Sequence, residues 1–227
     1  MKKLLSFISV FAVCTVFTFA DVPGNKNSKA GKTMTDYEKI VSLVNWERQA
    51  RTRHLPDLKD CYFEDATVTT SWTRGPASNY LNGNEGSVID AEHPVINRTG
   101  NAIVHLNGNR AYVELPSTTT RWMDVNGKIA VLESYMRLIY SVEKRNGEWK
   151  IVDMCSINEG DTLSPAVVGE DLKINPDDLK QFRHSYRYLA YIRSLRGIKM
   201  SDDEFGIDRP ETVNKLYEEK EEWIKIK

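Results

Sequence analysis

Three Asn-Gly dipeptides divide the stretch His93–Asn158 into segments with the composition of β-strands. Asn-Gly is the strongest short-range signal for a β-hairpin, because both residues tolerate the positive φ angles of a type I′ turn. The dipeptides are Asn107-Gly108, Asn126-Gly127 and Asn146-Gly147. They predict a four-stranded antiparallel meander with strands near Ala102–Leu106, Arg110–Thr120, Lys128–Glu143 and Glu148–Asn158.

The third predicted strand carries apolar residues on both faces, with Val131 and Ile139 on one face and Leu132 and Leu138 on the other. Such a strand is typical of the middle of a sheet that is covered on both sides. We therefore expect helices on the concave face of a curved sheet. The fold class predicted is α+β, with an earlier strand at Ala66–Trp72 beside the meander.

Helix signals lie on both sides of the meander. Thr35 and Glu38 form a capping box, and the apolar spacing that follows predicts a helix to about His54. Pro56 then begins a short second helix. After the meander, Asn175-Pro176 begins a helix whose apolar stripe continues to a stop at Gly197, and Asp208-Arg209-Pro210 begins another. The two late helices predict an appendage packed on the same domain.

The first twenty residues have the pattern of a signal peptide. Lys2 and Lys3 precede the uncharged apolar run Leu4–Phe19, and Ala20 ends an acceptable cleavage pattern. The run is short for a membrane span, so we expect export and no stable span after processing. The predicted organisation is a signal peptide (1–20), a flexible linker (21–34), an α+β cone domain (35–160) and a C-terminal helical extension (161–227).

Charge and motifs exclude several function classes. The 31 Lys and Arg nearly balance the 32 Asp and Glu, whereas a nucleic-acid-binding chain is expected to be basic. The sequence contains no phosphate loop, dinucleotide fingerprint or Cys/His metal spacing, so no cofactor or metal is predicted. After processing, Cys61 and Cys155 remain. In an oxidising compartment they could form a disulfide, and buried free thiols are the alternative.

The order of elements resembles the SnoaL-like family of the nuclear transport factor 2-like superfamily, which includes ketosteroid isomerase and scytalone dehydratase. The resemblance covers roughly Thr35–Asn158. The matching motifs are Asp57-Leu58, Phe63-Glu64-Asp65-Ala66 and Glu148-Trp149-Lys150-Ile151. The resemblance implies a cone-shaped sheet that holds a hydrophobic small molecule, and a possible homodimer through the outer face of the sheet. This fold hosts enzymes and binding proteins alike.

His93 is the residue to which the resemblance gives a catalytic role. Dehydratases of this kind carry a histidine at this place, and an imidazole with a pKa of about 6.5 can act as general acid and base. Asp153 is the carboxylate that we expect beside it. The family's first-helix tyrosine and aspartate fall near Trp46 and Arg51, and neither replacement can do the same chemistry.

Two functions therefore stay open. One is a lyase or isomerase of the dehydratase type that uses His93, and the other is a non-catalytic ligand-binding or dimerisation module. Arg51 could bind an anionic group of the ligand, or could be a solvated residue near a helix end. The residues expected to bind the ligand are Trp46, Arg51, Tyr62, Trp72, Trp122 and Tyr135.

Overall fold

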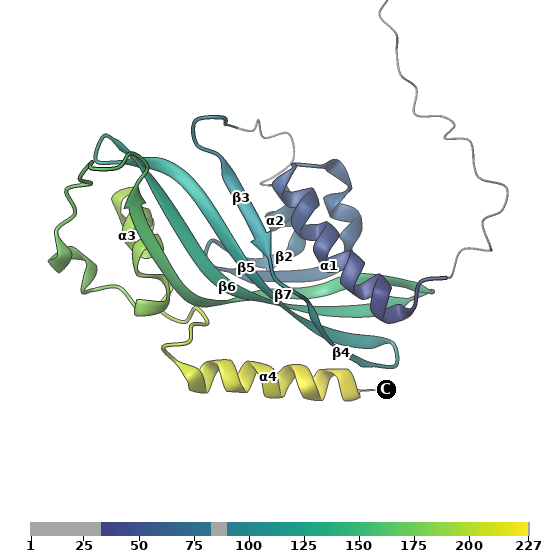
Figure 1. The fold of residues 1–227 in the computed structure, drawn as a ribbon. Helices are drawn as coiled ribbons and strands as arrows, with labels where there is room; N and C mark the ends of the chain where they lie inside the picture. The colour runs from purple at the N-terminus through teal and green to yellow at the C-terminus, as the bar shows by residue number, and fades with distance from the viewer. Residues whose placement is uncertain (1–32, 83–89, 227) are drawn as a thin grey trace, which may run out of the picture. The chain divides into compact units, whose positions relative to one another are not determined.

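The structure is a computed structural model that describes residues 33–82 and 90–226 (Figure 1). Residues 34–227 form one compact unit. The predicted signal peptide and most of the predicted linker lie outside the described residues. Within the described residues, no helix has both the length and the apolar composition needed to cross a membrane.

The predicted meander is confirmed, with longer strands than the sequence indicates. The four strands are β4 (Ile103–Asn107), β5 (Arg110–Val125), β6 (Lys128–Arg145) and β7 (Glu148–Pro165). All successive pairs are antiparallel. Because β7 continues to Pro165, the predicted domain limit at residue 160 falls inside a strand.

Two of the three hairpin turns have the predicted geometry. Asn126 and Gly127 have φ angles of 50° and 74°, and Asn146 and Gly147 have 52° and 86°. Both positions of these two-residue loops are thus left-handed, as a type I′ turn requires. The first turn differs, because Asn107 pairs with Arg110 and so belongs to the strand. Its loop is Gly108-Asn109, with positive φ at the first position only.

Within residues 33–82 and 90–226 the sheet has seven strands and is mixed, whereas the sequence predicted an antiparallel one. Its order is β2-β1-β7-β6-β5-β3, with β4 also pairing with β5. The earlier strand β1 (Tyr62–Thr70) runs parallel to β7. β2 (Thr73–Pro76) pairs antiparallel with β1, and β3 (Val95–Thr99) pairs antiparallel with β5. No local signal fixes the direction of β1, since its partner lies far along the chain.

Helix α1 (Asp36–Thr52) covers the concave face of the sheet (Figure 1). The capping box forms as predicted, because the Glu38 amide donates to Thr35 Oγ1 at 3.2 Å and the Thr35 amide donates to Glu38 Oε2 at 2.6 Å. A 3-10 helix at Pro56–Cys61 and helix α2 (Ala77–Asn82) follow. The main core contains Ile40 and Val44 of α1 together with Leu115, Leu138, Tyr140 and Met154 of the sheet.

The C-terminal extension is divided between the two faces of the sheet. The long helix expected after Asn175 is instead three short pieces: 3-10 turns at Pro176–Leu179 and His184–Tyr186, and helix α3 (Arg187–Leu195). The interruption allows Asp161 of β7 to accept a hydrogen bond from the Leu189 amide at 2.7 Å. Tyr191 and Ile192 of α3 then pack on Leu132 and its neighbours.

Helix α4 (Pro210–Lys225) lies on the opposite, convex side of the sheet from α1 (Figure 1). Its buried Leu216 packs against Ile139, Cys155 and Ile157. Lys220 forms an ion pair with Asp153 at 2.6 Å. Cys155 and Cys61 are both buried and free, so the alternative of two reduced thiols is the one that the structure shows.

Candidate ligand-binding site

A cavity of about 410 Å³ lies between α1, α3 and the concave face of the sheet. Its apolar wall is formed by side chains from the Ser71-Trp72 turn, the strands and α3. These residues are Trp72, Leu132, Met136, Leu138, Met154 and Leu189. Its polar wall includes Arg48 and Arg51 of α1, Arg121 of β5 and Arg193 of α3. The cavity thus combines an apolar surface with guanidinium groups.

Beneath the cavity, Glu47 is a fully buried carboxylate that accepts hydrogen bonds from four side chains. Oε1 accepts from Arg48 at 2.6 Å and from Tyr62 at 3.0 Å, and Oε2 accepts from Tyr140 at 2.8 Å. Tyr80 donates to Oε1 at 3.4 Å and itself accepts from Arg48. Burial acts to raise the pKa of Glu47, but the charge and hydrogen bonds of Arg48, together with Tyr140, lower it overall. Glu47 is therefore an ionised, fully satisfied structural group.

Arg51 is held against two aromatic rings at the cavity wall. Its guanidinium carbon lies 3.7 Å from the centroid of the Tyr80 ring and 4.9 Å from that of Trp72. The two rings stack with their centroids 5.2 Å apart. Arg51 also donates to the Tyr80 carbonyl at 3.3 Å. These contacts fix the position of the guanidinium while leaving Arg51 in the lining of the cavity.

A chain of hydrogen bonds joins α1 to the sheet across another part of the cavity wall. Thr119 of β5 donates to Asn97 Oδ1 at 2.8 Å, and Asn97 Nδ2 donates to Thr52 Oγ1 at 2.9 Å. All three residues line the cavity. Because each side chain is oriented by the next, this wall offers polar groups in fixed positions.

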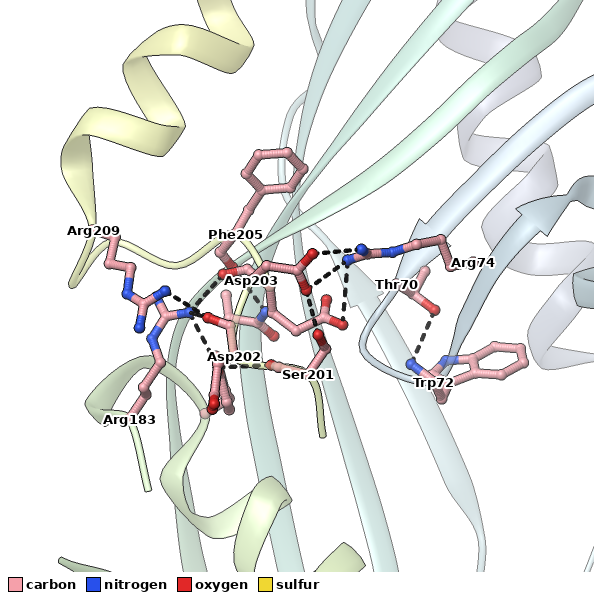
Figure 2. A network of polar contacts seen from close by, with 12 residues as sticks. Thr70, Trp72, Arg74, Arg183, Ser201, Asp202, Asp203, Phe205 and Arg209 are labelled. Atoms are coloured by element: carbon pink, nitrogen blue, oxygen red, sulfur yellow. Dashed lines mark hydrogen bonds and ion pairs between the residues drawn. The ribbon is translucent and has the colours of Figure 1, made fainter. Parts of the chain in front are cut away.

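Polar contacts join the segment between α3 and α4 to the residues before α3 and to β2 (Figure 2). Arg183, just before α3, donates to the carbonyls of Asp202 and Glu204 at 2.9 and 2.8 Å. Asp203 forms a double hydrogen bond to Arg74 of β2, at 2.7 and 3.2 Å. The extension therefore contacts the strand that follows Trp72, and α3 adds Leu189 and Arg193 to the lining.

The structure places two of the six predicted ligand-binding residues, Arg51 and Trp72, in the cavity lining. Trp46 is 40% exposed and Tyr62 belongs to the buried network around Glu47. Trp122 and Tyr135 are not part of the lining either. Each follows or precedes a lining residue on its strand, Arg121 or Met136, and successive side chains of a strand point to opposite faces.

The predicted pair of His93 and Asp153 is not formed. His93 lies before β3, where Nδ1 is 2.9 Å from Asp90 and Nε2 is 3.0 Å from Asp124. Asp153 instead accepts hydrogen bonds from Thr67 at 2.6 Å and from Lys220 at 2.6 Å. His93 does not belong to the cavity lining. The catalytic role of His93 stays a prediction, and Asp153 is not the carboxylate beside it.

The hydrogen bond to Asp90 raises the pKa of His93, and desolvation opposes this only in part. A raised pKa means that the charged imidazole stabilises the fold below the unfolded pKa of about 6.5, and that this contribution is lost as the pH rises through the folded value. We expect Asp90→Asn to lower the pKa of His93, as followed by NMR titration of its ring protons. The control Glu92→Gln should change it much less, because Glu92 acts only through its charge. An unchanged pKa in Asp90→Asn would contradict the assignment.

Sequence reasoning missed Glu47, Arg121 and Arg193. A signal for Glu47 was present, because it falls on the apolar stripe of α1, seven residues after Ile40 and three after Val44. A charge on such a stripe predicts a buried partner. Nothing in the local sequence indicates that Arg121 and Arg193 meet, since they lie on β5 and α3. Among the described residues, no group of three or more His, Cys, Asp and Glu side chains could hold a metal ion.

Comparisons with curated proteins identify two fungal relatives. Pea pathogenicity protein 2 of Fusarium vanettenii is 30% identical over 98 residues, which is 43% of this chain and 42% of that protein. The chain thus matches less than half of that relative's length. A PEP2-like protein of the same fungus is 23% identical over 210 residues, covering 88% of this chain and 90% of the relative.

Among solved structures, a hexachlorocyclohexane dehydrochlorinase is 14% identical, with 61% of this chain and 92% of that chain covered and a TM-score of 0.45. A nuclear transport factor 2-like protein with a cystatin-like fold from Novosphingobium aromaticivorans is 15% identical, with 53% and 80% covered and a TM-score of 0.41. The sequence model of the SnoaL-like domain matches residues 32–154, which is more than half of the chain. The chain therefore belongs to the SnoaL-like domain family.

Proposed function

We propose that the protein binds a hydrophobic small molecule in the cavity on the concave face of its sheet. The observation that carries this proposal is the cavity itself. Its volume of about 410 Å³ falls within the range of roughly 300–1,000 Å³ that is typical of small-molecule sites. Its wall joins an apolar surface from Trp72, Met136 and Leu189 to oriented polar groups such as Asn97.

Binding is favoured over acid–base catalysis by His93. A general base must reach the substrate and be unprotonated, but His93 lies outside the cavity lining and its two carboxylate neighbours favour the protonated ring. A dehydratase- or isomerase-type reaction with His93 as acid or base is the alternative function. If native mass spectrometry identifies a ligand that the protein converts, full turnover of that ligand by His93→Ala would exclude a catalytic role for His93.

The proposal is tested by native mass spectrometry of the purified protein after incubation with an extract of small apolar metabolites. We expect a mass increase that is retained by the control Thr162→Trp and abolished by Ser156→Trp. Both residues lie on β7, but Ser156 is buried and lines the cavity whereas Thr162 is exposed. A tryptophan at Ser156 would occupy the space that the ligand needs.

Thermal unfolding of each variant serves as the folding control, since overpacking costs about 1–3 kcal/mol. Ser134→Phe, from the adjacent strand β6, is a second variant that fills the cavity with a smaller added volume. Retention of the same ligand by folded Ser156→Trp and Ser134→Phe would show that the ligand binds elsewhere. Absence of any bound species in the wild-type protein would refute ligand binding.

A further inference from the structure

The cavity has an unusual distribution of charge. Four arginines line it, and its lining, drawn from the described residues, contains no Asp or Glu. Arg48 forms an ion pair with the buried carboxylate of Glu47, and the charge of Glu47 also acts on Arg51. The remaining arginines come from three different elements, with Arg51 on α1, Arg121 on β5 and Arg193 on α3. The fold therefore gathers arginines from three elements around one cavity.

Within the described residues, the charged groups that act on Arg121 are all cations. Desolvation lowers the pKa of Arg121, and the charges of Arg196, Arg193 and Arg51 lower it further. No carboxylate is among the groups that shift it. Its side chain is nevertheless accessible from the cavity, because it projects from the concave face. A guanidinium stays protonated in proteins, so the repulsion between Arg121 and the neighbouring arginines destabilises the folded protein.

Arg193 of α3 has an unsatisfied hydrogen-bond donor. Its Nε is buried and has no hydrogen-bond partner among the described residues. Desolvation lowers the pKa of Arg193, and only the charge of Glu204 opposes this. A buried N–H without an acceptor costs free energy that an acceptor on a ligand would restore.

We infer that the ligand of this cavity is an organic anion whose carboxylate or phosphate group binds between Arg121 and Arg193, with Arg51 as the third cation. Guanidinium groups pair with both kinds of anion through two parallel hydrogen bonds, and these bonds are about twice as strong as neutral ones. The apolar part of the ligand then packs on the accessible side chains of Trp72, Met136 and Leu189. This inference rests on the proposed function, since it assigns a chemical class to the same ligand.

The structure favours an amphipathic anion over a small inorganic one. The accessible apolar side chains of the wall, Trp72, Met136 and Leu189, would stay in contact with water around free phosphate, whereas an attached apolar group would cover them. The stacked pair of Trp72 and Tyr80 presents a flat surface next to Arg51. An aromatic or polycyclic body therefore fits the wall better than a flexible chain does.

Calorimetric titration with matched ligand series tests the inference. The compounds of one series share an apolar body, which is phenyl, naphthyl or steroid. They differ in the attached polar group, which is a carboxylate, a phosphate monoester or a neutral carboxamide. We expect the anions of at least one body to bind about tenfold to hundredfold more tightly than its carboxamide, as expected for charged hydrogen bonds. The carboxylate and phosphate arms identify which anion is preferred, with inorganic phosphate as the probe without a body.

Arg121→Gln should remove most of this preference by weakening the anions about tenfold or more, while leaving carboxamide binding unchanged. The control Arg53→Gln makes the same change of net charge at an exposed residue outside the lining, and should retain the preference. Arg121→Gln should also unfold at the same or a higher temperature, because it relieves repulsion between cations. Arg193→Gln is the second variant.

The outcomes separate the two claims. Equal affinity for anions and carboxamides, in the wild-type protein and in Arg121→Gln, would overturn the anion inference while leaving hydrophobic binding in place. An anion preference that survives in both Arg121→Gln and Arg193→Gln would overturn the assignment to these arginines. Failure of every body to bind in any form would refute the proposed function together with the inference.

Discussion

Replacing Glu47 with alanine is expected to lower the free energy of unfolding by about 3–5 kcal/mol. The carboxylate is fully buried and its partner Arg48 is 6% exposed, so the change leaves a guanidinium without a counter-charge inside the protein. The hydroxyls of Tyr62 and Tyr140 also lose their acceptor. Each unsatisfied buried group adds its own desolvation cost.

Chemical denaturation monitored by circular dichroism measures the loss, and Glu218→Ala is the matched control. Glu218 is exposed on α4, so its replacement should change the free energy of unfolding by no more than about 0.5 kcal/mol. The double variant Glu47→Leu with Arg48→Met should recover much of the stability, because removing both charges eliminates the unpaired ion. A loss under 1 kcal/mol in Glu47→Ala would show that the network is solvated in solution.

The parts of the fold that follow from local sequence were predictable. The capping box at Thr35, the Asn-Gly turns and the central strand β6 depend on residues close together in the chain, so their patterns are visible in it. The parallel pairing of β1 with β7 depends on residues far apart in the chain, and no local pattern in the sequence indicates it. The division of the C-terminal extension between two faces of the sheet is a tertiary effect of the same kind.

The candidate site was predictable only in part, for a related reason. Arg51 was assigned from the family resemblance, which places it on the first helix facing the cone, and Trp72 was assigned, like the other aromatic residues, for its chemistry. Trp122 and Tyr135 were assigned to the pocket for their chemistry, but the alternation of side chains puts them one residue out of phase with the lining. Tyr135 and Met136 are adjacent on one strand, and only one of them can face the cavity.

The largest effect outside the concave core is expected from removal of α4. A chain that ends after Arg209 loses the burial of Leu216, the packing of Val213 and Tyr217 and the ion pair of Lys220 with Asp153. We expect the free energy of unfolding to fall by roughly 3–5 kcal/mol, since burying a leucine contributes about 1.5–3 kcal/mol and half-buried side chains add to this. Thermal denaturation of the two chains measures it.

Removal of α4 also uncovers an apolar strip on the convex face, formed by Ile139, Cys155 and Ile157. The resemblance to the family implied a homodimer through this face, yet in this chain α4 occupies it. We therefore expect sedimentation to show self-association of the truncated chain that the full chain does not show at the same concentration, because exposed apolar patches promote contact between copies. Leu216→Ala should destabilise the full chain by about 2–4 kcal/mol without self-association, and the exposed Lys215→Ala should do neither. Dimerisation of the full chain through this strip would contradict the expected position of α4, because α4 would have to leave the sheet. Equal stability of the full and truncated chains would show that α4 contributes no packing energy there.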